Sequence, residues 1–156
     1  MYFEDYAPGS VTELPSAAVS KELIIEFAQR YDPQPFHVDE HAAADGPFGG
    51  LIASGWHTCA LTMRAMVDGF LSPLSSLGSP GIDEVRWPAP VRPGDVLTGR
   101  ITVLEARVSR SKPDRGVLRV RIESLNQDGV TVLSMVGTIL LRRRPRHLRS
   151  ASGTAS

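Results

Sequence analysis

An acid and an imidazole stand five residues apart in the segment RYDPQPFHVDE, residues 30 to 40. Asp32 and His37 are separated there by two prolines, a glutamine and a phenylalanine. A histidine exchanges protons near neutral pH and a carboxylate can accept from a water, so such a pair can serve acid–base chemistry on one water. The two prolines fix φ in the connector and lower the entropy lost when the pair is held in one geometry. The structural alternative is a helix-ending turn, with Asp32 as a cap and His37 partly exposed.

A second segment with chemical potential is GGLIASGWHT, residues 49 to 58, in which a glycine-containing turn precedes an apolar stretch. The first amides of a helix have no partner inside that helix and lie at the positive end of its dipole. The Gly55 N–H is therefore a candidate donor to an oxyanion that develops during a reaction. A glycine-rich loop that packs against a sheet is the structural alternative.

The remaining reactive residue types form no recognisable site. Cys59 is the one cysteine of the chain, which excludes an internal disulfide and a multi-cysteine zinc site. His37 and His41 are four residues apart, but no third ligand stands at a diagnostic spacing, so we expect no metal. His57 lies on an apolar stretch, where a core histidine is the simpler interpretation. Ser54 is not in a G-x-S-x-G context, so a serine-hydrolase elbow is unsupported.

Composition and length favour one soluble globular domain. The 156 residues are 42% hydrophobic and 22% charged, and 17 basic residues balance 17 acidic ones. No net field therefore selects nucleic acid or a membrane as partner. The N-terminus does not resemble a signal peptide and no apolar run could span a bilayer, so we expect a cytoplasmic protein. Residues 142 to 149 contain five arginines, and we expect a domain over 1–142 followed by a basic, disordered tail over 143–156.

The first half of the sequence predicts two helices that would position the two candidate segments. Residues 10 to 18 resemble an edge strand, and residues 39 to 45 a short helical turn. Ser20 can cap a helix that Pro33 ends. Its expected buried face consists of Leu23, Ile24, Phe27, Ala28 and Tyr31. A second helix begins at Gly55 and is apolar on nearly all sides, which predicts a central position inside a sheet.

The second half alternates between apolar and polar residues. Strands are expected over 97–108, 117–125 and 130–141, with turns at 112–116 and at the Asn-Gln-Asp-Gly sequence of 126–129. One antiparallel sheet curled around an apolar helix is an α+β arrangement. The sheet edges left by such a fold are commonly covered by a second copy of the protein.

Taken together, these segments resemble the MaoC-like dehydratase family, the R-specific enoyl-CoA hydratases with a hotdog fold. The family signature Asp-x-Asn-Pro-hydrophobic-His is matched by DPQPFH, residues 32 to 37. The family's step at the start of the central helix is matched by Ser54-Gly55-Trp56. Its Pro-Val-x-x-Gly-Asp segment is matched by residues 90 to 95, and the resemblance covers roughly residues 2 to 142.

The resemblance implies a five-stranded antiparallel sheet wrapped around a long helix at residues 55 to 70, in a homodimer or a higher oligomer of dimers. It also implies a hydro-lyase that adds water to a 2-enoyl-CoA, or removes it from a 3-hydroxyacyl-CoA. Asp32 and His37 would hold the catalytic water, and the Gly55 N–H would bind the thioester oxygen. Coenzyme A would be the carrier of the substrate, so no bound cofactor or metal is expected.

Three positions depart from the family pattern and are expected to bind or select the substrate. Gln34 replaces an asparagine, Ser54 replaces a histidine, and Trp56 replaces a smaller apolar residue. Two other functions on the same fold remain open. A hotdog acyl-CoA thioesterase uses a carboxylate, often without a histidine five residues on. A non-catalytic acyl-CoA-binding subunit would be expected to lack Asp32 or His37, and both are present.

Overall fold

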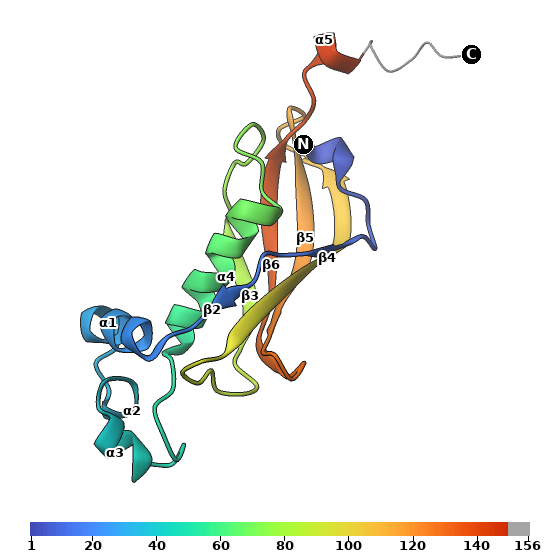
Figure 1. Cartoon of the computed structure of the whole chain (residues 1–156). Coiled ribbons are helices and arrows are strands. Elements are labelled where there is room, and N and C mark those ends of the chain that lie inside the picture. The colour runs from blue at the N-terminus through green and yellow to red at the C-terminus, as the bar shows by residue number, and fades with distance from the viewer. Residues whose placement is uncertain (150–156) are drawn as a thin grey trace.

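The alternating second half of the chain builds one antiparallel sheet, with a long helix beside it and smaller helices at one end (Figure 1). The computed structural model describes residues 1–149. In chain order the elements are η1 (Phe3–Asp5), β1 (Val11–Glu13), β2 (Ala17–Ala18), α1 (Lys21–Tyr31), α2 (Pro35–Val38), α3 (Glu40–Ala44), α4 (Gly55–Gly69), β3 (Gly81–Arg86), β4 (Val96–Val108), β5 (Arg115–Leu125), β6 (Thr131–Arg142) and α5 (Arg146–Arg149). The expected α+β class is confirmed.

The sheet has the strand order β1-β4-β5-β6-β3, and the short β2 also pairs with β4. The five-strand path agrees with the expectation, and β2 adds a sixth short strand. Alternation sets the core: Leu118, Val120 and Ile122 of β5 are almost completely buried. The predicted hairpin turn after β5 is confirmed, with Gly129 at φ 74°, where glycine avoids the strain of a Cβ. Among residues 1–149 β3 pairs only with β6, so it forms one edge of the sheet.

The long helix α4 lies along the sheet and has the central place that its sequence predicts (Figure 1). Its Met66 joins Ile101, Leu118 and Leu133 of the sheet in the main apolar cluster. The single chain covers only one side of α4, however. Trp56, Met63 and Val67 of α4 remain exposed, so the expectation of a helix enclosed all round does not hold for one chain. A helix that is apolar on its open side requires a further cover.

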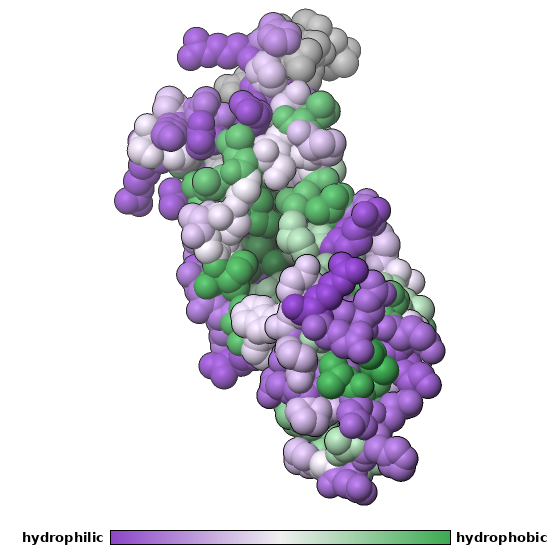
Figure 2. All heavy atoms as spheres, turned by 90° about the vertical axis from the view of Figure 1, so that its left-hand side faces the viewer, coloured by the Kyte–Doolittle hydropathy of each residue, from purple (hydrophilic) through white to green (hydrophobic). Residues whose placement is uncertain are grey.

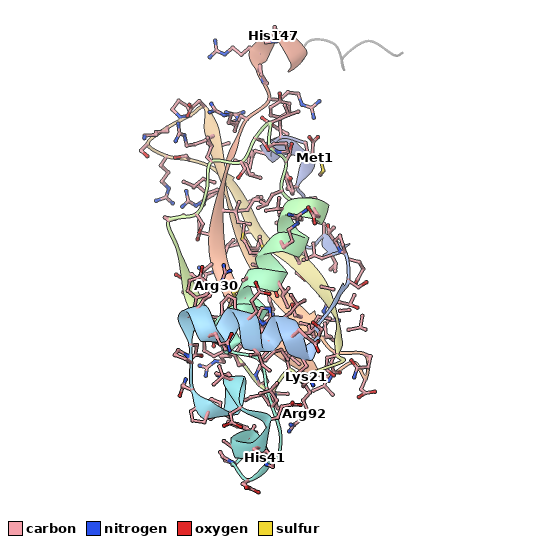
Figure 3. All side chains as sticks on the ribbon, turned by 60° about the vertical axis from the view of Figure 1, so that its left-hand side comes forward. Met1, Lys21, Arg30, His41, Arg92 and His147 are labelled. Carbon is pink, nitrogen blue, oxygen red and sulfur yellow. The ribbon has the colours of Figure 1, made fainter. Side chains whose placement is uncertain are left out.

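The helix α1 begins as predicted, with Ser20 Oγ accepting from Leu23 N–H at 3.2 Å. Its predicted buried face is too wide: Ile24 and Ala28 are fully buried, whereas Leu23 and Tyr31 are exposed. Figure 3 shows the reason, because α1 lies across the start of α4 with Lys21 and Arg30 near its two ends. A helix that crosses its support at one place buries a narrow stripe.

The predicted core histidine is confirmed at the crossing of these two helices. His57 is 5% exposed, and its ring stacks on that of Phe27 with a centroid distance of 4.7 Å and an interplanar angle of 7°. Its Nδ1 is buried and has no hydrogen-bond partner among the described residues. Burial lowers the pKa of His57 below its ordinary value, because a charged imidazole would lose its hydration there.

We expect His57 to make the protein less stable as the pH falls below about 6.5, its ordinary pKa. The unfolded chain then takes up a proton that the folded protein resists, so the free energy of unfolding decreases. His57→Phe keeps an aromatic ring against Phe27 but cannot be protonated, and the variant should lose less stability between pH 7.5 and 5.5. Urea denaturation at the two pH values measures this difference. Equal losses in the two proteins would contradict the assignment.

The C-terminal segment departs from expectation. We predicted disorder from residue 143, but Arg143 pairs with Glu4 and Arg144 with Asp5, which connects the end of β6 to η1. Arg143 also donates to the backbone oxygen of Pro113 at 3.1 Å. Charge pairing with an acidic N-terminal turn therefore orders residues that composition alone marks as a tail. Residues 150–156 of the predicted tail lie outside the described residues.

Within residues 1–149, no helix has the length and apolar character needed to cross a bilayer. In the same residues, no group of three His, Cys, Asp or Glu side chains is placed to hold a metal ion.

Candidate active site

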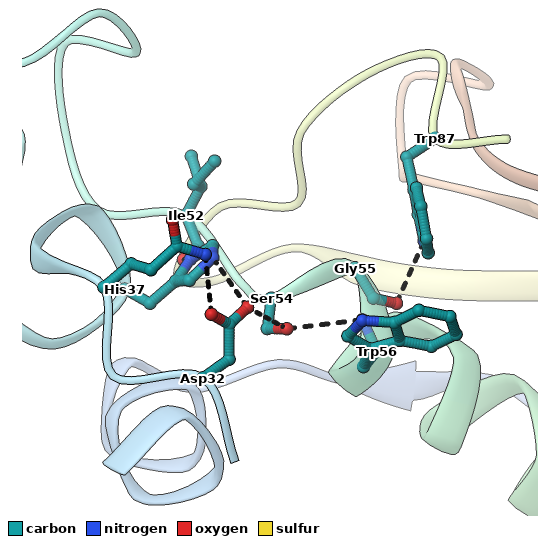
Figure 4. Close-up of polar contacts among 8 residues, drawn as sticks. Asp32, His37, Ile52, Ser54, Gly55, Trp56 and Trp87 are labelled. Carbon is teal, nitrogen blue, oxygen red and sulfur yellow. Dashed lines mark hydrogen bonds and ion pairs between the residues drawn. The ribbon is translucent and has the colours of Figure 1, made fainter.

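The proline-containing connector folds back on itself and brings its two ends together. Asp32 ends α1, where its N–H donates to Ala28 O at 2.8 Å. Pro35 opens α2 at a first-turn position, where the missing N–H costs no hydrogen bond. His37 follows in α2, so its Nε2 lies 3.2 Å from Asp32 Oδ2 (Figure 4). The short helix α2 was not predicted, and it is the element that turns the imidazole toward the carboxylate.

The other ring nitrogen of His37 determines its tautomer. Nδ1 lies 2.7 Å from the backbone oxygen of Ile52, which can only accept a hydrogen bond. Nδ1 therefore carries a proton and donates it to Ile52 O, which leaves Nε2 for the contact with Asp32. His37 is 4% exposed, and the ring of Phe36 packs edge-on against it at a centroid distance of 4.5 Å. The imidazole is thus held in one orientation with its Nε2 beside Asp32.

Asp32 accepts hydrogen bonds on both carboxylate oxygens. Gln34 Nε2 donates to Oδ1 at 2.6 Å, and Ser54 Oγ donates to Oδ2 at 2.7 Å. Burial by itself would raise the pKa of Asp32, but the hydrogen bonds from Gln34 and Ser54, together with His37, outweigh it and hold the pKa below its ordinary value. Asp32 is therefore a carboxylate near neutral pH.

Ser54 connects this pair to the long helix. Its side chain is fully buried, accepts from Trp56 N–H at 3.3 Å as the N-cap of α4, and donates to Asp32. The hydroxyl thereby sets the position of the carboxylate relative to the first amides of α4. Neither Ser54 nor Gln34 lines the pocket described below, so their assignment to substrate binding stays a prediction while their contacts with Asp32 are direct.

Replacing Ser54 by alanine should raise the pKa of Asp32, because the variant removes one of the side-chain donors that favour the ionised form. If Asp32 must be ionised for turnover, the acid limb of the pH–rate profile should move to higher pH. Loss of the N-cap should also cost about 0.5–2 kcal/mol of stability. The pH dependence of kcat/KM and a urea titration measure the two effects. An unchanged acid limb would show that the Ser54 bond does not tune Asp32. Ser54→Thr keeps the hydroxyl and serves as the control.

The first amide of α4 is open for a ligand. Gly55 is the first residue of the helix, and within the described residues its N–H donates no hydrogen bond. The ring of Trp87 covers the α-carbon of Gly55, and its Nε1 donates to Gly55 O at 3.0 Å. A Cβ at position 55 would lie 2.5 Å from Trp87 Cε2, so Trp87 can take this place only beside glycine.

These groups open into one pocket of about 450 Å³. Its lining includes Asp32, His37, Gly55, Phe48, Trp56 and Trp87. A carboxylate, the imidazole beside it, and an amide at a helix start therefore face one space. Volumes of roughly 300–1,000 Å³ are typical of small-molecule sites. The arrangement can place a water on the acid–base pair and an oxyanion on the amide.

The sequence-predicted residues thus separate into two groups. Asp32, His37, Gly55 and Trp56 line the pocket, whereas Gln34 and Ser54 support Asp32 from behind. The catalytic roles of the first three are predictions that the geometry supports. Trp87 was missed. It stands 32 residues from Gly55, just before the Pro-Val-x-x-Gly-Asp segment of residues 90 to 95, and no spacing rule connects the two positions.

Comparison with known proteins gives consistent matches. The profile of the family described as MaoC like domain matches residues 5–124. The "Uncharacterized protein YdeM" of Bacillus subtilis is 31% identical over 143 residues, which is 92% of this chain and 100% of that protein. The 3-hydroxybutyryl-CoA dehydratase of Methylorubrum extorquens is 34% identical over 107 residues, covering 67% of this chain and 65% of that protein.

Among solved structures, the MaoC-like dehydratase from Rhodospirillum rubrum is 42% identical, covers 93% of this chain and 99% of its own, and superposes with a TM-score of 0.87. The sheet around a central helix is accordingly the hotdog fold that the sequence motifs suggested. The profile match extends over both the acid–base connector and the start of α4. The chain belongs to the MaoC-like dehydratase family.

Proposed function

We propose that the protein is a hydro-lyase that interconverts a 2-enoyl-CoA thioester and the corresponding 3-hydroxyacyl-CoA. The observation that carries this proposal is the pocket onto which an ionised Asp32, the adjacent imidazole of His37 and the Gly55 N–H all open. The name of the related 3-hydroxybutyryl-CoA dehydratase supports the same reaction class.

In the hydration direction, a water bound by both Asp32 and His37 attacks C3 of the conjugated thioester. The pair takes one proton from this water as the new C–O bond forms and the double bond moves toward C1. The negative charge that develops on the thioester oxygen is stabilised by the Gly55 N–H and by the positive end of the α4 dipole. The pair then gives one proton to C2, so it returns to its starting state and the elements of water have been added. Dehydration follows the same steps in reverse.

This chemistry requires no redox step and no group beyond the residues described. Coenzyme A enters and leaves as part of the substrate, and no cofactor or metal has a role in the proposed steps. We also propose that the protein is a homodimer or a higher assembly of dimers. The free edge of β3 and the exposed apolar side of α4 both favour pairing with a second copy.

Two alternative functions are less well supported. A thioesterase requires a water directed at the thioester carbonyl carbon. Here Oδ2 of Asp32 contacts the imidazole of His37, and this pair suits proton exchange at the neighbouring carbons C2 and C3. A binding subunit without turnover needs neither the fixed tautomer of His37 nor the donors that keep Asp32 ionised.

The test is a turnover assay on a panel of 2-enoyl-CoAs that differ in length and branching. Hydration destroys the conjugated enoyl-thioester chromophore, so the ultraviolet absorbance falls while the thioester stays intact. A thiol-reactive dye in a parallel reaction reports any free coenzyme A. Loss of the chromophore without free thiol supports the hydro-lyase, free thiol supports a thioesterase, and no reaction with tight acyl-CoA binding supports the binding subunit. Either of the last two results would overturn the proposal.

A further inference from the structure

A second cavity lies directly beside the catalytic pocket. It has a volume of about 420 Å³ and lies between α4 and the β3–β6 side of the sheet. Its lining is almost entirely apolar and includes Trp56, Cys59, Ala60, Met63, Ile82 and Met135. Figure 2 shows apolar side chains gathered around a hollow on the side of the molecule that lies at the left of Figure 1. Of the described residues, Trp56 alone lines both this cavity and the catalytic pocket.

The position of Trp56 follows from helical spacing. Trp56, Cys59, Ala60 and Met63 recur at intervals of three and four residues, so they share one face of α4. This face leads from the Gly55 amide into the apolar cavity. Trp56 is the first residue of this face after Gly55 and lines both cavities, so an acyl chain that is bound at Gly55 and extends along this face passes the Trp56 indole.

Trp87 packs directly against Trp56. The two indoles pack edge to face, with a centroid distance of 5.3 Å and an interplanar angle of 80°. Trp87 is itself held by its hydrogen bond to Gly55 O. Trp56 is thus supported by a ring that packs on the glycine of the catalytic pocket, although its own side chain is 60% exposed.

We infer that Trp56, supported by Trp87, is the residue that restricts this enzyme to thioesters of short acyl chains, by closing the catalytic pocket off from the apolar cavity beside it. This inference rests on the proposed function. The two indoles leave space for the reacting carbons next to Asp32, His37 and Gly55, and they deny a longer chain the apolar surface that would stabilise it. A smaller residue at position 56 joins the two cavities.

The experiment compares crotonyl-CoA with 2-octenoyl-CoA in the wild type and in Trp56→Ala. The wild type should prefer crotonyl-CoA. The variant should raise the ratio of kcat/KM for octenoyl-CoA over crotonyl-CoA by at least about tenfold, because each methylene that enters an apolar site contributes roughly fourfold in affinity. Since Trp56 is mostly exposed, the variant is expected to fold. Trp56→Leu provides a second, less drastic truncation and should shift the ratio in the same direction.

Two controls distinguish a barrier formed by Trp56 from a general effect of substitution on the enzyme. Leu74→Ala removes an exposed apolar side chain that lines neither cavity, and its selectivity should equal that of the wild type. Ala60→Phe, introduced into Trp56→Ala, fills the apolar cavity and should reverse the gain for octenoyl-CoA. Binding of saturated octanoyl-CoA and butyryl-CoA, measured by calorimetry, should shift in parallel with the kinetic ratio.

The outcomes distinguish this inference from the proposed function. If the wild type hydrates crotonyl-CoA but Trp56→Ala and Trp56→Leu leave the ratio unchanged, the inference fails and the hydro-lyase stands. A wild type that prefers octenoyl-CoA also overturns the inference. If no 2-enoyl-CoA is hydrated by the wild type, the proposed function fails, and a tighter binding of octanoyl-CoA to Trp56→Ala would still support the barrier.

Discussion

Asp32→Asn is expected to lower kcat by about 10²–10⁴-fold, the range that general acid–base catalysis contributes, while the protein remains folded. The amide has nearly the shape of the carboxylate, but it carries no charge and cannot take a proton from water. It also offers only one oxygen, so it cannot accept from both Gln34 and Ser54 as Asp32 does. Steady-state kinetics on the best 2-enoyl-CoA, with circular dichroism to verify folding, measures the effect.

A matched control for this variant lies in the next helix. Asp39 caps α3 by accepting from the backbone N–H groups of His41 and Ala42, and it does not line the pocket. Asparagine caps helices about as well as aspartate, so Asp39→Asn should keep both its stability and its activity. The two substitutions change the same charge at nearby positions. Equal activity in the two variants would remove Asp32 from the mechanism.

Combining Asp32→Asn with His37→Ala tests whether the two residues act as one unit. Groups that share a single proton-transfer task lose little more together than either loses alone. We therefore expect the double variant to be about as slow as the slower single variant. If the two losses of kcat multiply, Asp32 and His37 contribute independently. The hypothesis that they act on one shared water would then be wrong.

Gly55→Ala is expected to have the second-largest effect. Its Cβ would lie 2.5 Å from Trp87 Cε2 and 2.7 Å from Trp87 Nε1, so the indole must leave its place over the helix start. We expect the displaced ring and the shifted amide to reduce kcat by about 10²–10³-fold, as the loss of one oxyanion donor does. Kinetics on the same substrate measures this loss.

The thermal stability of Gly55→Ala gives an independent test of the same contact. Alanine is the better helix former by about 0.8–1 kcal/mol, so propensity alone predicts a more stable protein. Overpacking against Trp87 should instead cost about 1–3 kcal/mol, and the net result should be a lower Tm. Gly81→Ala is the control, because nothing lies within 4 Å of a Cβ built there. A Gly55→Ala protein that is more stable and fully active would refute the close packing of Trp87 on Gly55.

A rescue experiment distinguishes the steric effect from an effect on the amide itself. In Gly55→Ala, the additional change Trp87→Ala removes the ring that the new methyl group overlaps. If displacement of the ring distorts the helix start, the double variant should recover part of the stability lost by Gly55→Ala. No recovery would place the damage in the backbone of Gly55.

Much of the candidate site follows from features local in sequence. The five-residue spacing of Asp32 and His37 and the two prolines predicted a stiff connector, and the connector does bring the side chains to 3.2 Å. Ser20 and Pro33 predicted the limits of α1, and alternation predicted β4, β5 and β6. These features are determined by sequence because caps, prolines and side-chain periodicity act over a few residues, whatever the rest of the chain does.

The tertiary structure decided how distant segments meet. Ser54 became the donor that holds Asp32, and Trp87 came to rest on Gly55, across separations of 22 and 32 residues. The pairing of Arg143 and Arg144 with Glu4 and Asp5, and the open apolar side of α4, likewise depend on where whole elements dock. No local propensity encodes such contacts, because they result from the packing of helices and loops around one core. The sequence alone therefore indicated which residues are candidates for the chemistry, and the packing determined which residues orient them and how far the pocket extends.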